Sequence, residues 1–451
     1  METQKDYRLS SSDQDLSSIE IGHVFERMPL TSQHWKAGFA LFFTFVIEAW
    51  EMMIMVFISS MIAADFGLNN VETGEIIGSI FLGMIPGTLV WGKLVDKYGR
   101  KQSIITSLIL YGILSLISAF STSFEMLYIT RFLSGAVFSG VLVATFPYFS
   151  ELLPSKSRGT VAVYLASGWP IGTLIALGIT LLFNHLSWHW ILAISSLGGL
   201  WFLVVKKLVP ESPYWLAEKN RTDDAKEVIL KLSENKLEPF INDKKIIISQ
   251  VTRGSVLDIF KGKLLKTTVL QVVINFCFSW GYWALFSWMP YMLAESKGFS
   301  FVSSLGFVLV SALVQFPGYI AASYLTGKFG RKKVMSVFVT LAAIGGFGFA
   351  LSSTVTELLI YLAILSFFSL GSWGVWDVWM GELYPTNIRG ISYSLGASAQ
   401  RVANWIAPTA IGALLALKTS FFVTNGIIAS FLVITAIATL FLHETEGQTL
   451  N

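Results

Sequence analysis

Two glutamates and two arginines lie within long apolar segments of this chain, where charged side chains are costly and mark functional sites by default. Glu48 and Glu51 fall in the first segment, and their spacing of three puts both on one face of a helix. Arg131, in the fourth segment, is placed to reach Glu51, and less easily Glu48. Arg401 lies near the middle of the eleventh segment, where a guanidinium suits two-pronged binding of a carboxylate. The alternative for Glu51 and Arg131 is a static ion pair that fixes helix packing.

Long apolar runs must position these side chains. Of the 451 residues, 53% are hydrophobic and 14% are charged, whereas soluble domains carry about 25% charged residues. Runs of about 20 residues match a hydrocarbon core roughly 30 Å thick, and single lipid-facing segments must be helical to satisfy their own backbone. We therefore expect an all-α integral membrane protein of twelve transmembrane helices in two six-helix halves. The segments are 36–62, 72–91, 103–121, 125–150, 160–183, 188–206, 266–294, 302–326, 334–353, 357–381, 391–416 and 420–442.

A repeat relates the two halves. The motif ELLPSKSRG at 151–159 returns as ELYPTNIRG at 382–390, and KYGRK at 97–101 returns as KFGRK at 328–332, both displaced by 231 residues. A shared offset indicates a duplicated unit, a pattern of transporters whose site lies at the repeat interface near the bilayer midplane. The boundaries are an N-terminal tail at 1–33, the first half at 34–206, a linker at 207–265, the second half at 266–442 and a C-terminal tail at 443–451.

Basic residues gather in alternate short loops. One set of loops holds eleven, whereas the other holds only Lys297 and Lys418. The positive-inside rule therefore puts the first set, the linker and both termini in the cytosol. The N-terminus does not have the pattern of a signal peptide, and residues 19–28 are expected to form an amphipathic helix on the membrane surface.

Two sets of motifs resemble the major facilitator superfamily. The segment GKLVDKYGRK at 92–101 resembles the signature between that superfamily's second and third helices, although Ser323 and Gly327 replace the first glycine and the acid in the second copy. PESPYWL at 210–216 and HETEG at 443–447 are similar to motifs of its sugar-porter-like branch. The resemblance implies a cytosolic gate formed by Gly92, Asp96, Gly99, Arg100, Glu151, Arg158, Arg331, Glu382 and Arg389. Gly92 would let helices approach closely, and Glu151, Arg158, Glu382 and Arg389 would pair when the protein faces outward.

The apolar segments carry a further resemblance. Arg131 and Gly135 are similar to the RxxxG motif of the superfamily's fourth helix, and in proton-coupled relatives an acid on helix one beside this arginine carries the proton. This implies proton coupling by Glu51 or Glu48 with Arg131. Those relatives usually have aspartates at the two positions, so the choice of acid stays open.

The segment around Arg401 resembles organic-ion transporters and bacterial niacin and aromatic-acid carriers. At the matching position anion carriers tend to have arginine and cation carriers aspartate, which implies a substrate carboxylate on Arg401. The alternative is that Arg401 pairs with Asp377, and the two roles are compatible. Tryptophans in helices seven and ten could stack on a flat substrate or belong to an interface belt. The candidate substrate-binding residues are Arg401, Gln400, Asn404, Trp280, Trp283, Trp373 and Asp377.

These features favour a secondary active transporter that takes up a small organic acid, nicotinate-like or aromatic, together with a proton. The alternatives are a sugar or organic-cation porter and, more distantly, a non-transporting membrane sensor; helix seven lacks the QQxxGxN pattern of sugar porters. The sequence gives no support for an enzyme, a metal site or a nucleic-acid partner. The first external loop is short, which favours a bacterial inner membrane. We expect a monomer, whose partners are the bilayer and a small-molecule substrate. No cofactor is expected beyond the coupling proton.

Overall fold

The computed structural model describes residues 18–154, 167–242, 244–248, 255–385 and 387–446. The first half contains α2 (Ser32–Phe66), α3 (Asn70–Tyr98), α4 (Arg100–Ser118), α5 (Phe124–Leu152), α7 (Gly168–Phe183) and α8 (Trp188–Ser196), which continues through the 3-10 turn η2 (Leu197–Trp201) into α9 (Phe202–Leu208). The second half contains α13 (Gly262–Lys297), α14 (Phe301–Phe329), α15 (Arg331–Leu351), α16 (Val355–Glu382), α17 (Arg389–Ala416) and α18 (Phe421–Thr439).

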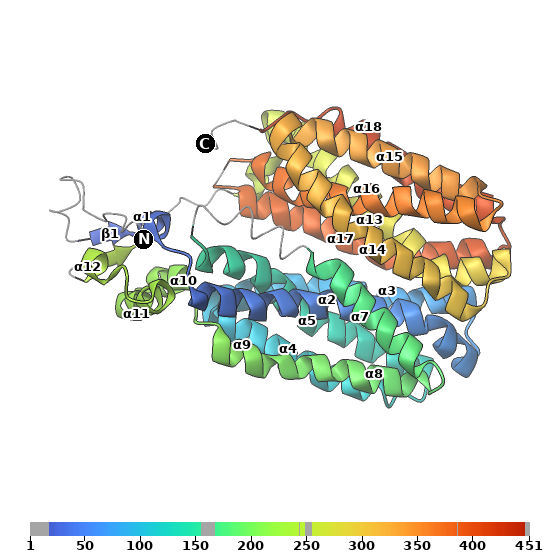
Figure 1. Cartoon of the computed structure of the whole chain (residues 1–451), viewed down its shortest axis with the longest axis horizontal. Helices are drawn as coiled ribbons and strands as arrows, with labels where there is room; N and C mark the ends of the chain where they lie inside the picture. The colour runs from blue at the N-terminus through green and yellow to red at the C-terminus, as the bar shows by residue number, and fades with distance from the viewer. Residues whose placement is uncertain (1–17, 155–166, 243, 249–254, 386, 447–451) are drawn as a thin grey trace, which may run out of the picture.

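The two sets of helices form two bundles that lie side by side along the length of the molecule (Figure 1). Among the described residues, ten helical segments are long and apolar enough to cross a bilayer, and α7 is a shorter apolar helix. The 28-residue α17 completes the second set of six, and its lower hydropathy reflects polar residues such as Gln400, Arg401 and Asn404. The prediction of an all-α membrane protein with two six-helix halves is confirmed.

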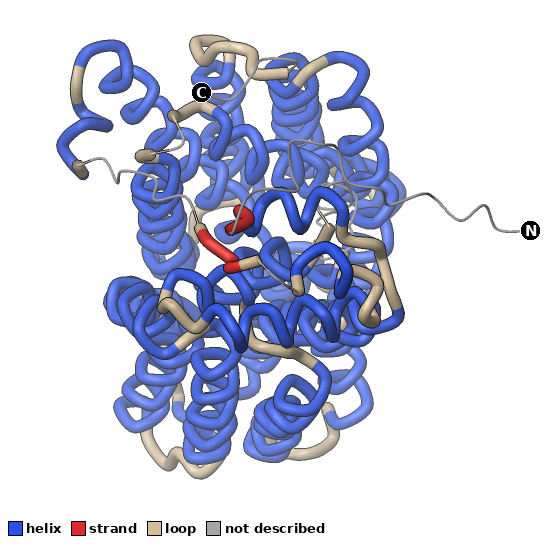
Figure 2. Tube along the Cα trace, turned by 90° about the vertical axis from the view of Figure 1, so that its left-hand side faces the viewer, coloured by secondary structure: helices blue, strands red, loops and turns tan. Residues whose placement is uncertain are grey.

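The linker adds α10 (Pro213–Glu218), α11 (Thr222–Ser233), α12 (Glu238–Ile241), β2 (Lys245–Ile247) and the 3-10 turn η3 (Val256–Phe260) at one end of the bundles, which we call the linker end. The opposite end is called the far end. The chain reaches α2 through β1 (Ser18–Glu20) and α1 (Ile21–Arg27). β1 pairs in parallel with β2, and Figure 2 shows both short strands at the linker end.

The segment 18–34, which we call the N-terminal clasp, is fastened to the linker. Val24 and Phe25 on α1 have no exposed surface, and the Phe25 ring lies 5.1 Å from that of Tyr214. The Thr31 hydroxyl donates to the Leu232 carbonyl at 2.6 Å. The predicted helix at 19–28 is present over Ile21–Arg27 and is preceded by the strand β1. Its apolar face is buried against protein, which stabilises it there.

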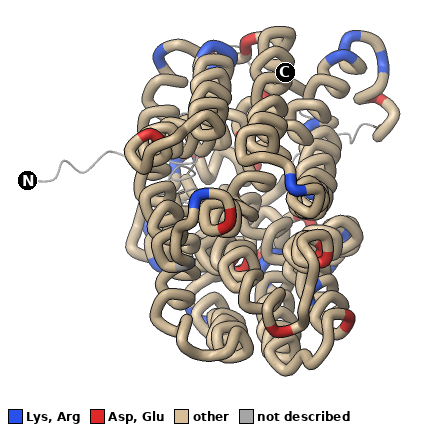
Figure 3. The backbone as a smooth tube through the Cα atoms, turned by 90° about the vertical axis from the view of Figure 1, so that its right-hand side faces the viewer, with Lys and Arg blue, Asp and Glu red and all other residues tan. Residues whose placement is uncertain are grey.

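At the far end the halves meet along α3 and α17, where glycines bring the two backbones together. A Cβ added at Gly74 would lie 2.5 Å from the Pro408 carbonyl oxygen, and one at Gly412 would overlap the Asn70 carbonyl oxygen. Trp288 of α13 donates to the Pro408 carbonyl at 2.8 Å. Viewed from this end, charged positions are scattered among mostly uncharged backbone (Figure 3). The far end is therefore closed by close packing.

Candidate functional site

Glu51 and Arg131 form a buried ion pair within the first half. Nη2 of Arg131, on α5, lies 2.7 Å from Oε1 of Glu51, on α2, and neither side chain has exposed surface. Tyr111 of α4 donates to the other carboxylate oxygen of Glu51 at 2.8 Å, and its hydroxyl also lies 3.2 Å from the Ser195 carbonyl. Arg131 Nη2 donates to Ser134 at 2.8 Å. Three helices thus converge on one carboxylate.

This pair is balanced but incompletely bonded. Arg131 Nε and Nη1 have no hydrogen-bond partner among the described residues. Loss of one charge from a buried pair leaves the other uncompensated, at a typical cost of about 3–5 kcal/mol. A proton on Glu51 would have that effect without changing a single residue. Sequence reasoning missed Tyr111, although a tyrosine in the third apolar segment was visible.

Glu48 belongs to a different group of charges. It is 2% exposed, and it interacts electrostatically with Arg401 of the second half. Arg401 in turn interacts with Asp377 of α16 and with Tyr393 of its own helix. Glu48 Oε2 and Arg401 Nε are buried and lack hydrogen-bond partners among the described residues. The sequence left Glu48 as the less favoured partner of Arg131, and in the structure Glu48 interacts with Arg401 instead, because three residues along α2 turn the two glutamates by about 60°.

Asp377 and Tyr393 both have exposed surface in the structure. Tyr393 is 42% exposed, and both side chains interact with Arg401. We call Glu48, Asp377, Tyr393 and Arg401 the inter-half cluster.

The tryptophans proposed to contact substrate divide into two groups. Trp283 lies where the halves meet, with its ring 4.5 Å from Phe81 of α3 and 6.0 Å from Trp169 of α7. Trp280 stacks on Phe431 of α18, and the Trp373 ring lies 4.6 Å from that of Phe278. Trp280 and Trp373 therefore pack within the second half, and Trp283 is placed beside both halves.

Two polar neighbours of Arg401 on α17 are held by α13. Gln400 donates to Asn275 Oδ1 at 2.6 Å. Asn404, in the amide orientation that satisfies both of its ends, accepts from Trp283 Nε1 at 3.1 Å and donates to the Gln400 carbonyl at 2.9 Å. These contacts leave the guanidinium of Arg401 as the strongest hydrogen-bond donor that this turn of α17 brings to the inter-half cluster.

At the linker end, each half carries the same arrangement of gate residues. Arg100 lies 3.2 Å from Glu151, and Arg331 lies 3.0 Å from Glu382. A hydroxyl donates to each of these carboxylates, from Ser212 in the first half and from Thr445 in the second. Asp96 is a more distant partner of Arg100, at 3.9 Å. Each gate arginine thus ties together helices of its own half.

A second glutamate caps a helix in each half. Glu211 accepts from the backbone N–H groups of Arg100 and Lys101 at 3.0 and 3.1 Å, and Glu444 accepts from those of Arg331 and Lys332 at 2.9 and 3.1 Å. A carboxylate there satisfies orphan donors and the positive end of the helix dipole. Burial raises the pKa of Glu211, and these N–H bonds oppose that rise.

Glycine is required where each cap forms. The φ angles of Gly99 and Gly330 are +97° and +91°, which L side chains rarely adopt. A Cβ at either position would also collide with the capping carboxylate. The glycine repeated in the two halves therefore permits a tight turn and also leaves room for the capping carboxylate.

Three gate predictions have other outcomes. Arg158 lies outside the described residues. Arg389 Nε and Nη2 lack hydrogen-bond partners among the described residues, so its pairing in an outward-facing state stays a prediction. A Cβ at Gly92 would meet open space, which makes the predicted close helix approach there wrong in this conformation.

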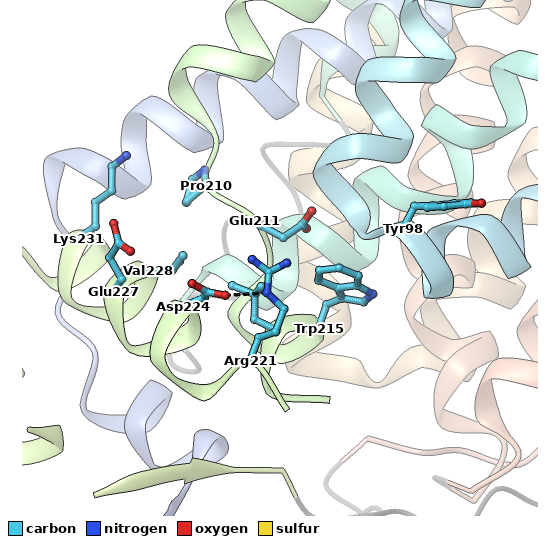
Figure 4. A pocket seen from close by; sticks show the side chains of 10 residues that line it. Tyr98, Pro210, Glu211, Trp215, Arg221, Asp224, Glu227, Val228 and Lys231 are labelled. Carbon is cyan, nitrogen blue, oxygen red and sulfur yellow. Dashed lines mark hydrogen bonds and ion pairs between the residues drawn. The ribbon is translucent and has the colours of Figure 1, made fainter. Parts of the chain in front are cut away.

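A cavity of about 300 Å³ lies at the linker end, away from the charges inside the bundles. It separates the end of α3 from α10 and α11, and an Arg221–Asp224 ion pair of 2.6 Å crosses its lining (Figure 4). Its lining residues are Tyr98, Pro210, Glu211, Trp215, Leu216, Arg221, Asp224, Glu227, Val228 and Lys231.

Comparison with known proteins identifies the family. The model of the Major Facilitator Superfamily matches residues 40–408 and 302–451. The chain belongs to this superfamily. It is a multi-pass membrane protein and a secondary transporter, as the sequence predicted.

Similar proteins extend over almost the whole chain. A niacin transporter, NiaP, of Acinetobacter baylyi is 28% identical over 94% of this chain and 98% of that protein. A putative niacin/nicotinamide transporter of Bacillus subtilis is 30% identical over 90% and 94% of the two chains. The solved xylose transporter XylE of E. coli, in a partially occluded inward-open conformation, has a TM-score of 0.76 at 18% identity and covers 93% of this chain and 100% of its own. The likeness to XylE shows the fold alone.

Proposed function

We propose that this transporter takes up a small organic acid, nicotinate-like or an aromatic carboxylate, together with a proton across a bacterial inner membrane. The observation that carries the proposal is the pairing of a buried Glu51–Arg131 ion pair with a second arginine, Arg401, between the halves. The niacin transporters among its relatives support a nicotinate-like substrate. The basic loops at the linker end support a cytosolic location for that end and for both termini.

Coupling begins at Glu51. While its carboxylate is charged, it holds Arg131 and accepts from Tyr111. A proton on Glu51 removes the partner charge of Arg131, so the guanidinium must find other contacts. A conformation that offers such contacts is then favoured, which is how a bound proton shifts a two-state equilibrium.

The substrate carboxylate binds Arg401. A guanidinium binds a carboxylate through two parallel N–H donors, which fixes the orientation of a flat acid as well as its charge. Trp283 and Tyr282 supply aromatic surface near the junction of the halves. The Trp169 indole of the first half donates to the Tyr282 hydroxyl of the second at 3.1 Å. The two halves then rock around the bound acid.

Uptake into proteoliposomes tests the proposal. Labelled nicotinate, glucose and an organic cation are each offered with and without an inward proton gradient. We expect gradient-driven accumulation of nicotinate that is lost on Arg401→Ala. Gradient-driven glucose accumulation that survives Arg401→Ala would instead identify a sugar porter and reject the organic-acid proposal.

A further inference from the structure

The inter-half cluster holds two acids and one arginine from three helices. Glu48 comes from the first half, whereas Asp377 and Arg401 come from the second. With both acids charged, the three side chains carry one net negative charge before any substrate enters. An organic anion on Arg401 would bring a third carboxylate to a single guanidinium. Since like charges in one site disfavour joint ionisation, one acid must become neutral when the anion binds.

Burial distinguishes the two acids. Asp377 has exposed surface, so water can solvate its charge. Glu48 is 2% exposed, and its Oε2 has no hydrogen-bond partner among the described residues. A buried carboxylate without bonding partners is costly once its counter-ion is shared with another anion. Glu48 is therefore the acid that a proton would neutralise.

The groups around Glu48 have other roles. Within the part of the chain that the structure describes, Glu48 interacts with Arg401 and with Tyr393, both on α17. Glu51, one helical turn away, is already engaged by Arg131 and Tyr111. The interaction of Glu48 with Arg401 connects the two halves. Neutralisation of Glu48 therefore weakens an attraction between the halves, whereas a proton on Asp377 weakens one within the second half.

We propose that Glu48 takes up a second proton whenever an organic anion binds Arg401, so that two protons enter with each monovalent anion. One proton travels on Glu51 and the other on Glu48, and both leave with the substrate. The only bonds made and broken are carboxyl O–H bonds. The cycle moves two positive charges and one negative charge inward, a net of one positive charge. This inference rests on the proposed function.

The charge carried per substrate can be measured directly. Wild-type protein is reconstituted in liposomes in which potassium and valinomycin set an inside-negative potential, with equal pH on both sides and labelled nicotinate as the probe. We expect the potential alone to drive nicotinate accumulation. At one net charge, tenfold accumulation corresponds to about 59 mV. Nicotinate uptake that follows a pH gradient but ignores the potential would overturn this inference and leave the proposed function intact. No nicotinate uptake under either gradient would overturn the proposed function.

Three variants assign the second proton. Glu48→Gln should make uptake independent of potential while a pH gradient still drives it, and potential-driven uptake in this variant would overturn the assignment. Asp377→Asn leaves Glu48 titratable: potential-driven uptake in this variant assigns the second proton to Glu48, whereas loss of that dependence in Asp377→Asn alone would move the proton to Asp377. Glu295→Gln, an exposed change at the far end of α13, is the matched control. If Glu48→Gln does not fold, the wild-type charge ratio and Asp377→Asn still decide.

Discussion

Tyr111 and Arg131 hold opposite oxygens of the same carboxylate, at 2.8 Å from Oε2 and 2.7 Å from Oε1 of Glu51. One contact is a hydrogen bond from an uncharged donor and the other an ion pair, so protonation of Glu51 affects them differently. The ion pair is lost, whereas the tyrosine can still donate to a neutral carboxyl. Tyr111 therefore keeps the carboxyl in place when Arg131 is released.

The first prediction concerns this carboxylate. Glu51→Gln should reduce proton-driven accumulation of nicotinate, because the variant carries no titratable group at this position and only the proton on Glu48 stays coupled. Counterflow exchange of labelled for unlabelled substrate should persist, since it requires no net proton movement. Both are measured in proteoliposomes, with Glu295→Gln as the control. Accumulation equal to that of the wild type in Glu51→Gln would show that Glu51 carries no coupled proton.

Arg401 provides the second prediction. Arg401→Ala should raise the apparent KM for nicotinate tenfold or more, because hydrogen bonds to charged groups contribute about 1.5–3 kcal/mol and about 1.4 kcal/mol is a factor of ten. Arg401→Lys should recover part of the affinity, since lysine keeps the charge but cannot form the bidentate hydrogen bonds of a guanidinium. Initial uptake rates give the KM, and Lys263→Ala, at the exposed start of α13, is the control. An unchanged KM would assign Arg401 to a structural pairing with Asp377.

The third prediction tests the helix caps. Gly99→Ala and Gly330→Ala should each destabilise the protein by about 1–3 kcal/mol, because they place a side chain in a glycine-only backbone conformation and against a capping carboxylate. Gly306→Ala provides the contrast: it lies in α14, and a Cβ there meets nothing within 4 Å, so it should be neutral or slightly stabilising. Thermal unfolding in detergent, followed by tryptophan fluorescence, compares the three variants. Equal midpoints would contradict the proposed need for glycine.

The fourth prediction is a pH dependence of the N-terminal clasp. Hydrogen bonds from Ser32, first from its side chain and then from its backbone, lower the pKa of Glu234. A lowered pKa means that the clasp gains stability above the unfolded-state pKa of about 4.3 and loses it as the pH falls through the folded value. Limited proteolysis at 18–34 should therefore accelerate as the pH falls from about 5 to 3. Glu234→Gln should lose most of this acceleration; an unchanged pH profile would contradict the assignment.

Hydropathy and the repeat were enough to predict the two halves, because membrane helices are specified by long local runs. Reach along a helix likewise predicted that Arg131 meets Glu51 rather than Glu48. The partner of Glu48 could not be predicted, since it depends on how α2 of one half is rotated toward α17 of the other. Tyr111 and Glu211 were missed for the same reason: each acts on a residue that lies far away in the sequence.

The glycine contacts between α3 and α17 imply that a single added methyl group can shift the equilibrium between the inward-facing and outward-facing conformations of this carrier. A methyl group at Gly74 would act as a wedge against the Pro408 carbonyl and would make closure of the far end costly, without altering any charge, proton site or substrate contact. Such a variant would favour the conformation that is closed at the linker end and open at the far end. The absence of a side chain at position 74 thus helps to determine the equilibrium between the two conformations of the transport cycle.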